Sequence, residues 1–180
     1  MGLKKLTLVA ALAALLVVGA IVAFAATRPD EFKIERSVVI EAPAARVYEL
    51  IVSPQKWEDW APWKARDPSL TSSFAGPASG AGSSWTWTSL ASGSGRLTLT
   101  TAAPETGVTY KLAFFEFDTE NDGAVALAPV ESGTQTTWTM TGNRRLLDKV
   151  IWLIFGMESS LGADFEGGLA RLEALAEGRN

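Results

Sequence analysis

The 180-residue chain contains no cysteine and no histidine. Without cysteine there is neither a disulfide nor a thiolate nucleophile. Without histidine the chain lacks the commonest general base and the commonest metal ligand. Serine–histidine and cysteine–histidine catalysis is therefore excluded by composition, and a zinc or iron site is not expected. We expect no metal and no cofactor, and the sequence favours a protein that is not an enzyme.

Clustered positive charge is also lacking. The 16 Lys and Arg residues are outnumbered by 20 Asp and Glu residues, for a formal net charge of −4. Beyond Lys4 and Lys5, no basic run is longer than the pair Arg144-Arg145. This charge pattern argues against nucleic acid as a partner and against electrostatic attachment to anionic lipid.

The N-terminal segment is by contrast strongly apolar. Within residues 6–26 only Thr7 and Gly19 are not hydrophobic, and a helix of about twenty such residues crosses the roughly 30 Å of a bilayer's hydrocarbon core. Lys4 and Lys5 precede the run, so the N-terminus is expected in the cytoplasm and the remainder outside it. We predict a single-pass anchor at residues 1–26. The alternative is a signal sequence cleaved near Ala25, which would release a secreted or periplasmic protein.

The remaining sequence predicts one domain at residues 32–180, joined to the anchor by a short linker at residues 27–31. Residues 32–40 alternate as a first strand. A short helix is expected from Pro43 to Ile51 and a second one around residues 56–59. Because Pro54 and Pro62 interrupt this stretch, Trp57, Trp60 and Trp63 are expected to crowd into a loop.

Six further strands are expected, separated by turn residues; they are residues 70–74, 83–89, 96–101, 108–115, 124–130 and 136–141. One of the turn signals is Asn121-Asp122-Gly123, expected as a hairpin tip. The last element, residues 148–177, has an apolar stripe typical of one long helix. The stripe consists of Met157, Leu161, Phe165, Leu169, Leu172 and Ala176. An antiparallel sheet offers one face on which to bury such a helix.

This order of elements is that of a helix-grip fold, and the residues support it. Arg36-Ser37-Val38-Val39-Ile40-Glu41-Ala42-Pro43 resembles the opening of the SRPBCC superfamily, the START-like and polyketide cyclase/dehydrase group. Four further blocks resemble its membrane-anchored members; they begin at Trp57, Gly93, Thr134 and Gly162. The resemblance implies an α+β fold: about seven curved antiparallel strands wrapped on a long C-terminal helix, with two short helices after the first strand. It also implies a deep apolar cavity between sheet and helix, but no shared catalytic residue.

The candidate ligand-binding residues are aromatic or methionine side chains, because flat rings stack on flat or apolar ligands. They are Trp60, Trp63, Trp85, Trp87, Tyr110, Phe114, Trp138, Met140, Met157 and Phe165. The same side chains could instead form a solid core. Catalysis would have to use residues such as Arg66, Arg96, Tyr110, Glu116 or Asp164.

Three functions therefore stay open. The favoured one is membrane-tethered binding of a small hydrophobic, lipid-like ligand. The alternatives are a cyclase or dehydratase acting in the same cavity, and an envelope interaction module with a filled core. A final apolar run at residues 150–155 is too short to span a membrane, and is expected either to pack in the core or to face the bilayer.

Overall fold

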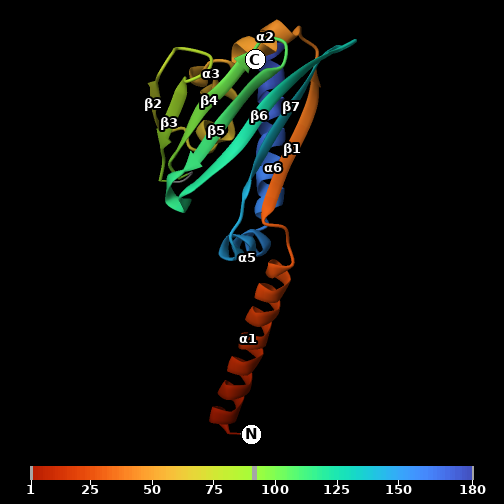
Figure 1. The fold of residues 1–180 in the computed structure, drawn as a ribbon. Helices are drawn as coiled ribbons and strands as arrows, with labels where there is room; N and C mark the ends of the chain where they lie inside the picture. The colour runs from red at the N-terminus through yellow and green to blue at the C-terminus, as the bar shows by residue number, and fades with distance from the viewer. Residues whose placement is uncertain (1, 91–92, 180) are drawn as a thin grey trace. The chain divides into compact units, whose positions relative to one another are not determined.

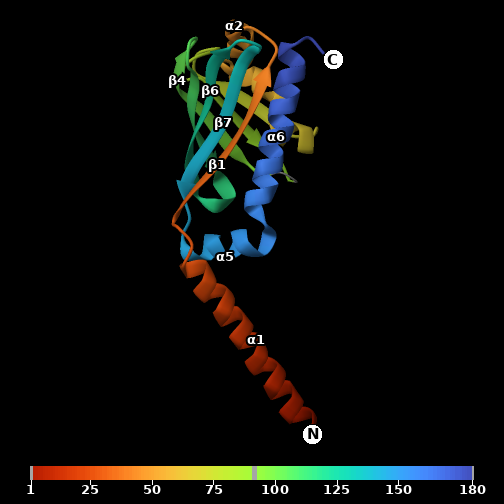
Figure 2. The same ribbon diagram turned by 90° about the vertical axis from the view of Figure 1, so that its right-hand side faces the viewer.

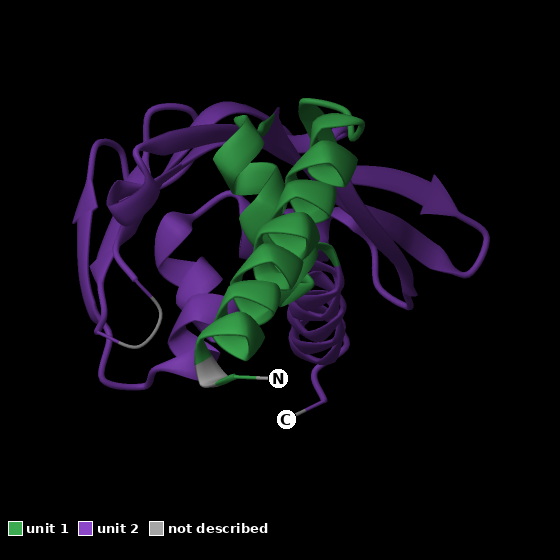
Figure 3. Cartoon of the chain, turned by 90° about the horizontal axis from the view of Figure 1, so that it is seen from below, with its two compact units in different colours: residues 1–32, 143–158 green, residues 33–142, 159–180 purple. Residues whose placement is uncertain are grey.

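The computed structural model describes residues 2–90 and 93–179 of the chain, drawn in Figure 1. The chain divides into two compact units, coloured in Figure 3. Unit 1 joins residues 1–32 to residues 143–158, and unit 2 joins residues 33–142 to residues 159–180. Segments distant in the sequence thus form each unit.

Unit 2 is built on the seven-stranded antiparallel sheet that the sequence predicts. Its strands are β1 (Glu31–Ile40), β2 (Thr71–Ala75), β3 (Ser84–Thr88), β4 (Gly95–Ala103), β5 (Gly107–Phe114), β6 (Thr119–Val130) and β7 (Gly133–Asn143). Their order across the sheet is β1-β7-β6-β5-β4-β3-β2, and each strand from β2 to β7 is antiparallel to the next. Consecutive hairpins therefore build the whole sheet except β1, which closes it beside β7.

Three short helices follow β1, one more than expected: α2 (Ala44–Ile51), α3 (Pro54–Trp60) and α4 (Pro62–Arg66). The predicted tryptophan loop is wrong, because the three tryptophans lie on α3 and α4. Pro54 and Pro62 each occupy the start of a helix. A missing N–H has no consequence at that position, so proline begins a helix there and does not break one.

The hairpin tip expected at Asn121-Asp122-Gly123 is also wrong, because these residues lie inside β6. The turn comes earlier, at the 3₁₀ helix η1 (Phe115–Phe117), followed by Asp118 in the left-handed region with φ 47°. Gly123 instead leaves room for the ring of Tyr110 to pack against β6. A Cβ there would lie 2.1 Å from Cζ of Tyr110 on the neighbouring strand, and a glycine inside a strand commonly marks such a close approach.

The C-terminal segment is two helices and not one: α5 (Leu146–Phe155) and α6 (Met157–Ala176). Gly156, with φ 61°, ends α5 in the left-handed conformation that glycine adopts freely. Within unit 2, α6 runs along one face of the sheet (Figure 2). Phe165, Leu169, Leu172 and Ala176 of the predicted stripe are buried, so the face that the spacing indicates is the face that packs.

Unit 1 contains α1 (Leu3–Ala26) and α5, which contact each other. Residues 4–26 of α1 are long and apolar enough to cross a membrane, a property that a signal sequence near an N-terminus shares. The expectation that residues 150–155 pack in the core is wrong: Ile151, Leu153, Ile154 and Phe155 are exposed.

Candidate ligand site in the aromatic interior

Five aromatic side chains from four elements of unit 2 form an inner cluster: Trp57 and Trp60 of α3, Tyr110 of β5, Trp138 of β7 and Phe165 of α6. All five are buried. Trp138 stacks on Phe165 with 4.0 Å between ring centroids, and its edge meets Trp60 at 5.0 Å. Trp57 contacts Trp60 at 4.3 Å and Tyr110 at 5.3 Å. These rings fill the space between sheet and α6 at this level.

The polar atoms of the inner cluster are paired with each other or with the main chain. Trp138 Nε1 donates to Tyr110 Oη at 2.6 Å. The indole N–H groups of Trp57 and Trp60 donate to main-chain carbonyls of α2 at 2.8 and 3.2 Å. Burial raises the pKa of Tyr110, and the hydrogen bond from Trp138 only partly opposes this. The phenol therefore stays neutral over the physiological range.

An outer cluster lies further along the same sheet face. It joins Trp63 of α4, Trp85 and Trp87 of β3, and Phe114 of β5. Trp63 stacks on Trp87 at 4.7 Å and 28° between ring planes, while Trp85 and Phe114 lie 5.1 and 6.2 Å from Trp87. Trp85 and Trp87 are completely buried, Trp63 is 6% exposed and Phe114 is half-buried. This cluster is thus the more accessible of the two.

Trp87 differs from Trp85 in one respect. Trp85 Nε1 donates to Ser72 Oγ at 3.0 Å. The buried Nε1 of Trp87 has no hydrogen-bond partner among the residues that the structure describes. A buried donor without a partner costs about 1–3 kcal/mol, and most such groups in proteins are paired. The outer cluster therefore contains one donor that a ligand acceptor would satisfy.

Polar contacts from two directions hold α4, which carries Trp63. Arg66 at its C-terminal end pairs with Asp164 of α6. The next residue, Asp67, accepts hydrogen bonds from Ser69 N at 2.9 Å and from Ser89 Oγ at 2.5 Å. Burial raises the pKa of Asp164, against the lowering effect of Arg66. The position of Trp63 thus depends on side-chain contacts outside the aromatic cluster.

A family model described as "Polyketide cyclase / dehydrase and lipid transport" matches residues 31–177, which contain both aromatic clusters. The chain belongs to this family. The match covers the sheet, the three short helices, α5 and the whole of α6, and leaves out α1. The SRPBCC relationship that the sequence motifs indicate is thereby confirmed.

Solved structures share the fold at low identity. The Aha1 dimer from Colwellia psychrerythraea is 18% identical, with a TM-score of 0.59 over 83% of this chain and 99% of that chain. The di-domain ARO/CYC StfQ from the steffimycin biosynthetic pathway is 15% identical, with a TM-score of 0.61 over 83% of this chain and 51% of that one. Ara h 8.0201 is 13% identical, with a TM-score of 0.59 over 82% and 99%. A comparison with curated proteins found no match.

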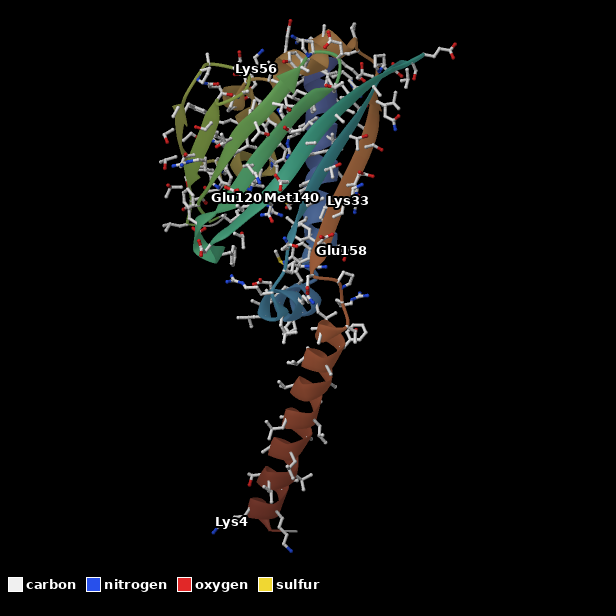
Figure 4. The ribbon with its side chains drawn as sticks, in the orientation of Figure 1. Lys4, Lys33, Lys56, Glu120, Met140 and Glu158 are labelled. Carbon is white, nitrogen blue, oxygen red and sulfur yellow. The ribbon has the colours of Figure 1, made fainter. Side chains whose placement is uncertain are left out.

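The predicted ligand-binding residues fall largely into these two clusters. Trp60, Tyr110, Trp138 and Phe165 belong to the inner cluster, and Trp63, Trp85, Trp87 and Phe114 to the outer one. Met140, labelled on β7 in Figure 4, is buried, and Met157 belongs to unit 1. The prediction omitted Trp57, which contacts three rings of the inner cluster.

The five candidate catalytic residues do not converge on one point. Among the contacts of the described residues, the one that joins two of these five is the ion pair between Arg66 and Asp164. Tyr110 is buried among the indoles, whereas Arg96 donates to Thr86 and Glu116 accepts from the main chain of Ser94, both on the surface. Within residues 2–90 and 93–179, no group of three acidic side chains could hold a metal ion.

A hollow of about 360 Å³ lies over β4 to β7. Six of its eight lining residues alternate with the buried residues along these strands, so it lies mainly on the face of the sheet away from the aromatic interior, and Tyr110 and Gly123 of the inward-facing positions also contribute to it. The lining residues are Thr100, Thr109, Tyr110, Asp122, Gly123, Ala124, Thr139 and Thr141. Four of the eight lining residues are threonines, and the hollow is not the apolar cavity that the family resemblance implies.

Proposed function

We propose that the chain is a membrane-tethered binding protein for a flat hydrophobic ligand, which enters the outer cluster between Trp63 and Trp87. The observation that carries the proposal is the Nε1 of Trp87, buried in a cluster of aromatic rings and without a hydrogen-bond partner among the described residues. A ligand with a carbonyl or hydroxyl oxygen would accept this N–H while its rings stack on the indoles. Such a molecule is apolar over most of its surface and polar at one edge.

Binding requires movement of Trp63, because its ring lies against Trp87. Trp63 is carried by a helix of five residues that begins at Pro62. This helix can shift without breaking a strand pair of the sheet. Short segments that hold few backbone hydrogen bonds are the parts of a fold that open most readily. We therefore assign α4 the role of the moving element and the sheet that of the fixed one.

Binding is favoured over catalysis by the chemistry of the interior. Tyr110 is the titratable residue of the two aromatic clusters, and its raised pKa keeps the phenol neutral. A neutral phenol donates or accepts a hydrogen bond but is a poor general base at neutral pH. A cyclase or dehydratase would need a second group aimed at the ligand, and Arg96 and Glu116 lie on the surface.

The tether is α1, whose apolar span of 23 residues begins at Lys4. Figure 4 labels Lys4 at the end of α1 remote from α5. Basic residues before the apolar span favour a cytoplasmic N-terminus. The ligand-binding domain would then lie on the opposite, extracytoplasmic side of the membrane. A domain held at the bilayer surface would meet hydrophobic ligands where they partition.

The proposal is tested with the full chain in phosphatidylcholine nanodiscs, titrated with emodin as a flat polycyclic probe and cis-parinaric acid as a flexible lipid-like probe. Trp87→Phe keeps a stacking ring but removes the N–H, so emodin affinity should fall about 2–10-fold, the value of one hydrogen bond. Trp85→Phe is the matched control, because the N–H that it removes is already bonded to Ser72. Empty nanodiscs correct for partitioning.

Equal losses in the two variants would contradict the role of Trp87. If parinaric acid binds and emodin does not, the ligand is an acyl chain and not a flat polycyclic molecule. If neither probe binds above the empty-nanodisc level, the filled interior favours the interaction module, because nothing then displaces the aromatic rings.

A further inference from the structure

Helix α5 presents apolar side chains on its outside. Among the residues of α5, only Lys149 is buried. The exposed residues, with exposed fractions from 36% to 70%, are Leu146, Leu147, Ile151, Leu153, Ile154 and Phe155. A contiguous apolar surface of this kind marks an interaction site and not an ordinary protein surface.

Contacts within unit 1 fix α5 to the residues that follow α1. Lys149 Nζ donates to the carbonyl oxygen of Arg28 at 2.7 Å and pairs with Asp30 Oδ1 at 2.5 Å. Hydrogen bonding to Lys149 lowers the pKa of Asp30, so this pair stays charged well into the acidic range. Lys149, the buried polar side chain of α5, therefore attaches this helix to the residues that follow α1.

An aromatic contact reinforces this attachment. Phe32 and Trp152 lie 4.5 Å apart, and the guanidinium of Arg144 lies over both rings, at 5.6 and 4.7 Å from their centroids. Arg144 Nη2 also donates to the carbonyl of Glu31 at 3.2 Å. Figure 2 shows α5 lying across the end of α1. The depth of α5 in a membrane is thus set by the depth at which α1 ends.

We propose that α5 is an interfacial helix, whose apolar side chains lie in the lipid of the bilayer that α1 crosses. The inference rests on the tether proposed above. The apolar run of α1 ends at Ala26, which places residues 28–32 and the attached α5 at the boundary between acyl chains and headgroups. Tryptophan and arginine beside aliphatic residues suit this layer.

The lipid partner need not be anionic. Arg144 and Lys149 are engaged by carbonyls, aromatic rings and Asp30, while Arg145 pairs with Asp148 at 3.4 Å. Within residues 144–155, each cation therefore already has a partner in the protein. Apolar burial is the driving force, and it is insensitive to salt, whereas attraction between exposed charges is screened.

Because the chain has no cysteine, single cysteines give unique labels in the full chain. Leu147→Cys and Ile154→Cys report on α5, Leu16→Cys on the middle of α1, and Gln135→Cys on an exposed position of β7. Each variant carries a nitroxide in phosphatidylcholine vesicles, and its accessibility to oxygen and to nickel-EDDA gives its depth by electron paramagnetic resonance. The α5 labels should lie about 5–10 Å below the phosphates, Leu16 deeper and Gln135 in water.

If Leu16 is deep but both α5 labels are as accessible to nickel-EDDA as Gln135, the interfacial helix is overturned and the tether stands. If Leu16 is itself accessible, the tether fails and the inference fails with it. Addition of 30% phosphatidylglycerol should leave the depths unchanged, and α5 labels that enter the bilayer only with this lipid would overturn the apolar basis. Near-UV circular dichroism checks that each variant keeps the aromatic packing.

Discussion

Trp85 and Trp87 stand two residues apart on one face of β3 and differ mainly in one hydrogen bond. Both are completely buried. The N–H of Trp85 donates a hydrogen bond to Ser72, whereas that of Trp87 has no hydrogen-bond partner in the part of the chain that the structure describes. A close approach also fixes Trp87, because a Cβ on Gly95 would lie 2.5 Å from its Cζ2 atom. The ring thus cannot turn freely to find a partner, and the unpaired donor is a property of the packed sheet.

The pair predicts a difference in stability. Trp85→Phe and Trp87→Phe lose the same ring volume, but only the first loses a hydrogen bond and only the second removes an unsatisfied donor. Trp85→Phe should therefore lower the free energy of unfolding by about 1–2 kcal/mol more than Trp87→Phe. Urea unfolding followed by circular dichroism measures both. Equal losses would mean that Trp87 Nε1 has a partner in solution.

Asp67 predicts a pH dependence. Hydrogen bonds from Ser69 and then from Ser89 lower the pKa of Asp67, so the carboxylate stabilises the fold only while it is ionised. This contribution is fully present above the unfolded pKa of about 3.9 and is lost as the pH falls from there through the lowered folded value. Asp67→Asn should lower the stability of the fold at pH 7. It should also make the loss of stability between neutral and acidic pH smaller than in the wild type.

The matched control is Asp59→Asn, which removes the same charge from an exposed position on α3. Thermal melts of both variants and the wild type between pH 7 and pH 2.5 provide the comparison. An Asp67→Asn variant that keeps the acid slope of the wild type would show that its hydrogen bonds do not persist in solution.

Helix α6 shows at the element scale what a sequence pattern does and does not determine. The spacing of apolar residues predicts the buried face, and the structure buries Phe165, Leu169 and Leu172 on it. The pattern does not distinguish the four glycines of the segment, because a glycine that ends a helix and one beneath an aromatic ring look alike. Gly156 ends α5, while Gly168 lies against Trp138, an approach that depends on the sheet.

The adjacent glycines Gly167 and Gly168 predict opposite effects of alanine. At Gly167 a Cβ would meet only Nη1 of Arg171, at 3.5 Å, so Gly167→Ala should gain up to about 1 kcal/mol of helix propensity. At Gly168 a Cβ would lie 2.6 Å from Cζ3 of Trp138, a ring without room to move. Gly168→Ala should therefore cost about 1–3 kcal/mol by overpacking.

Differential scanning calorimetry measures both changes, and Gly167→Ala serves as the internal control for helix propensity. Stabilisation by both substitutions would mean that α6 can move away from Trp138, which would leave room for a ligand between the helix and the sheet. Destabilisation by both would contradict the free space that the structure shows around Gly167.

Over the whole molecule, local patterns predicted well what depends on local chemistry. The succession of strands along the chain, the apolar N-terminal helix and the aromatic residues of the interior all follow from periodicity and composition. The division into units does not, because it joins residues 1–32 to residues 143–158. The contacts of Lys149 with Arg28 and Asp30 join residues more than a hundred positions apart in the sequence. The periodicity of apolar residues carries no information about such contacts.

The site was predictable to a similar degree. The alternation along β3, β5 and β7 indicates that Trp85, Trp87, Tyr110 and Trp138 share a face, and they do. The unpaired N–H of Trp87 depends on which neighbour each indole reaches in the folded protein, so the sequence pattern does not reveal it. The predicted role of these residues in ligand binding stays a prediction, because their rings contact one another.

The two units predict how the chain responds when α1 is removed. The aromatic clusters and the hydrogen bonds that hold them lie within unit 2, so a protein that begins at Arg28 should keep its near-UV circular dichroism and unfold cooperatively. Helix α5 keeps its contacts with Arg28 and Asp30 but loses those with α1. Its amide protons should therefore exchange faster, while those of β5 and β6 stay protected. Hydrogen exchange measured by mass spectrometry compares the shortened protein with the full chain in nanodiscs. Unchanged protection of α5 would mean that this helix is stable without α1, and lost near-UV signal would mean that the packing of unit 2 depends on unit 1.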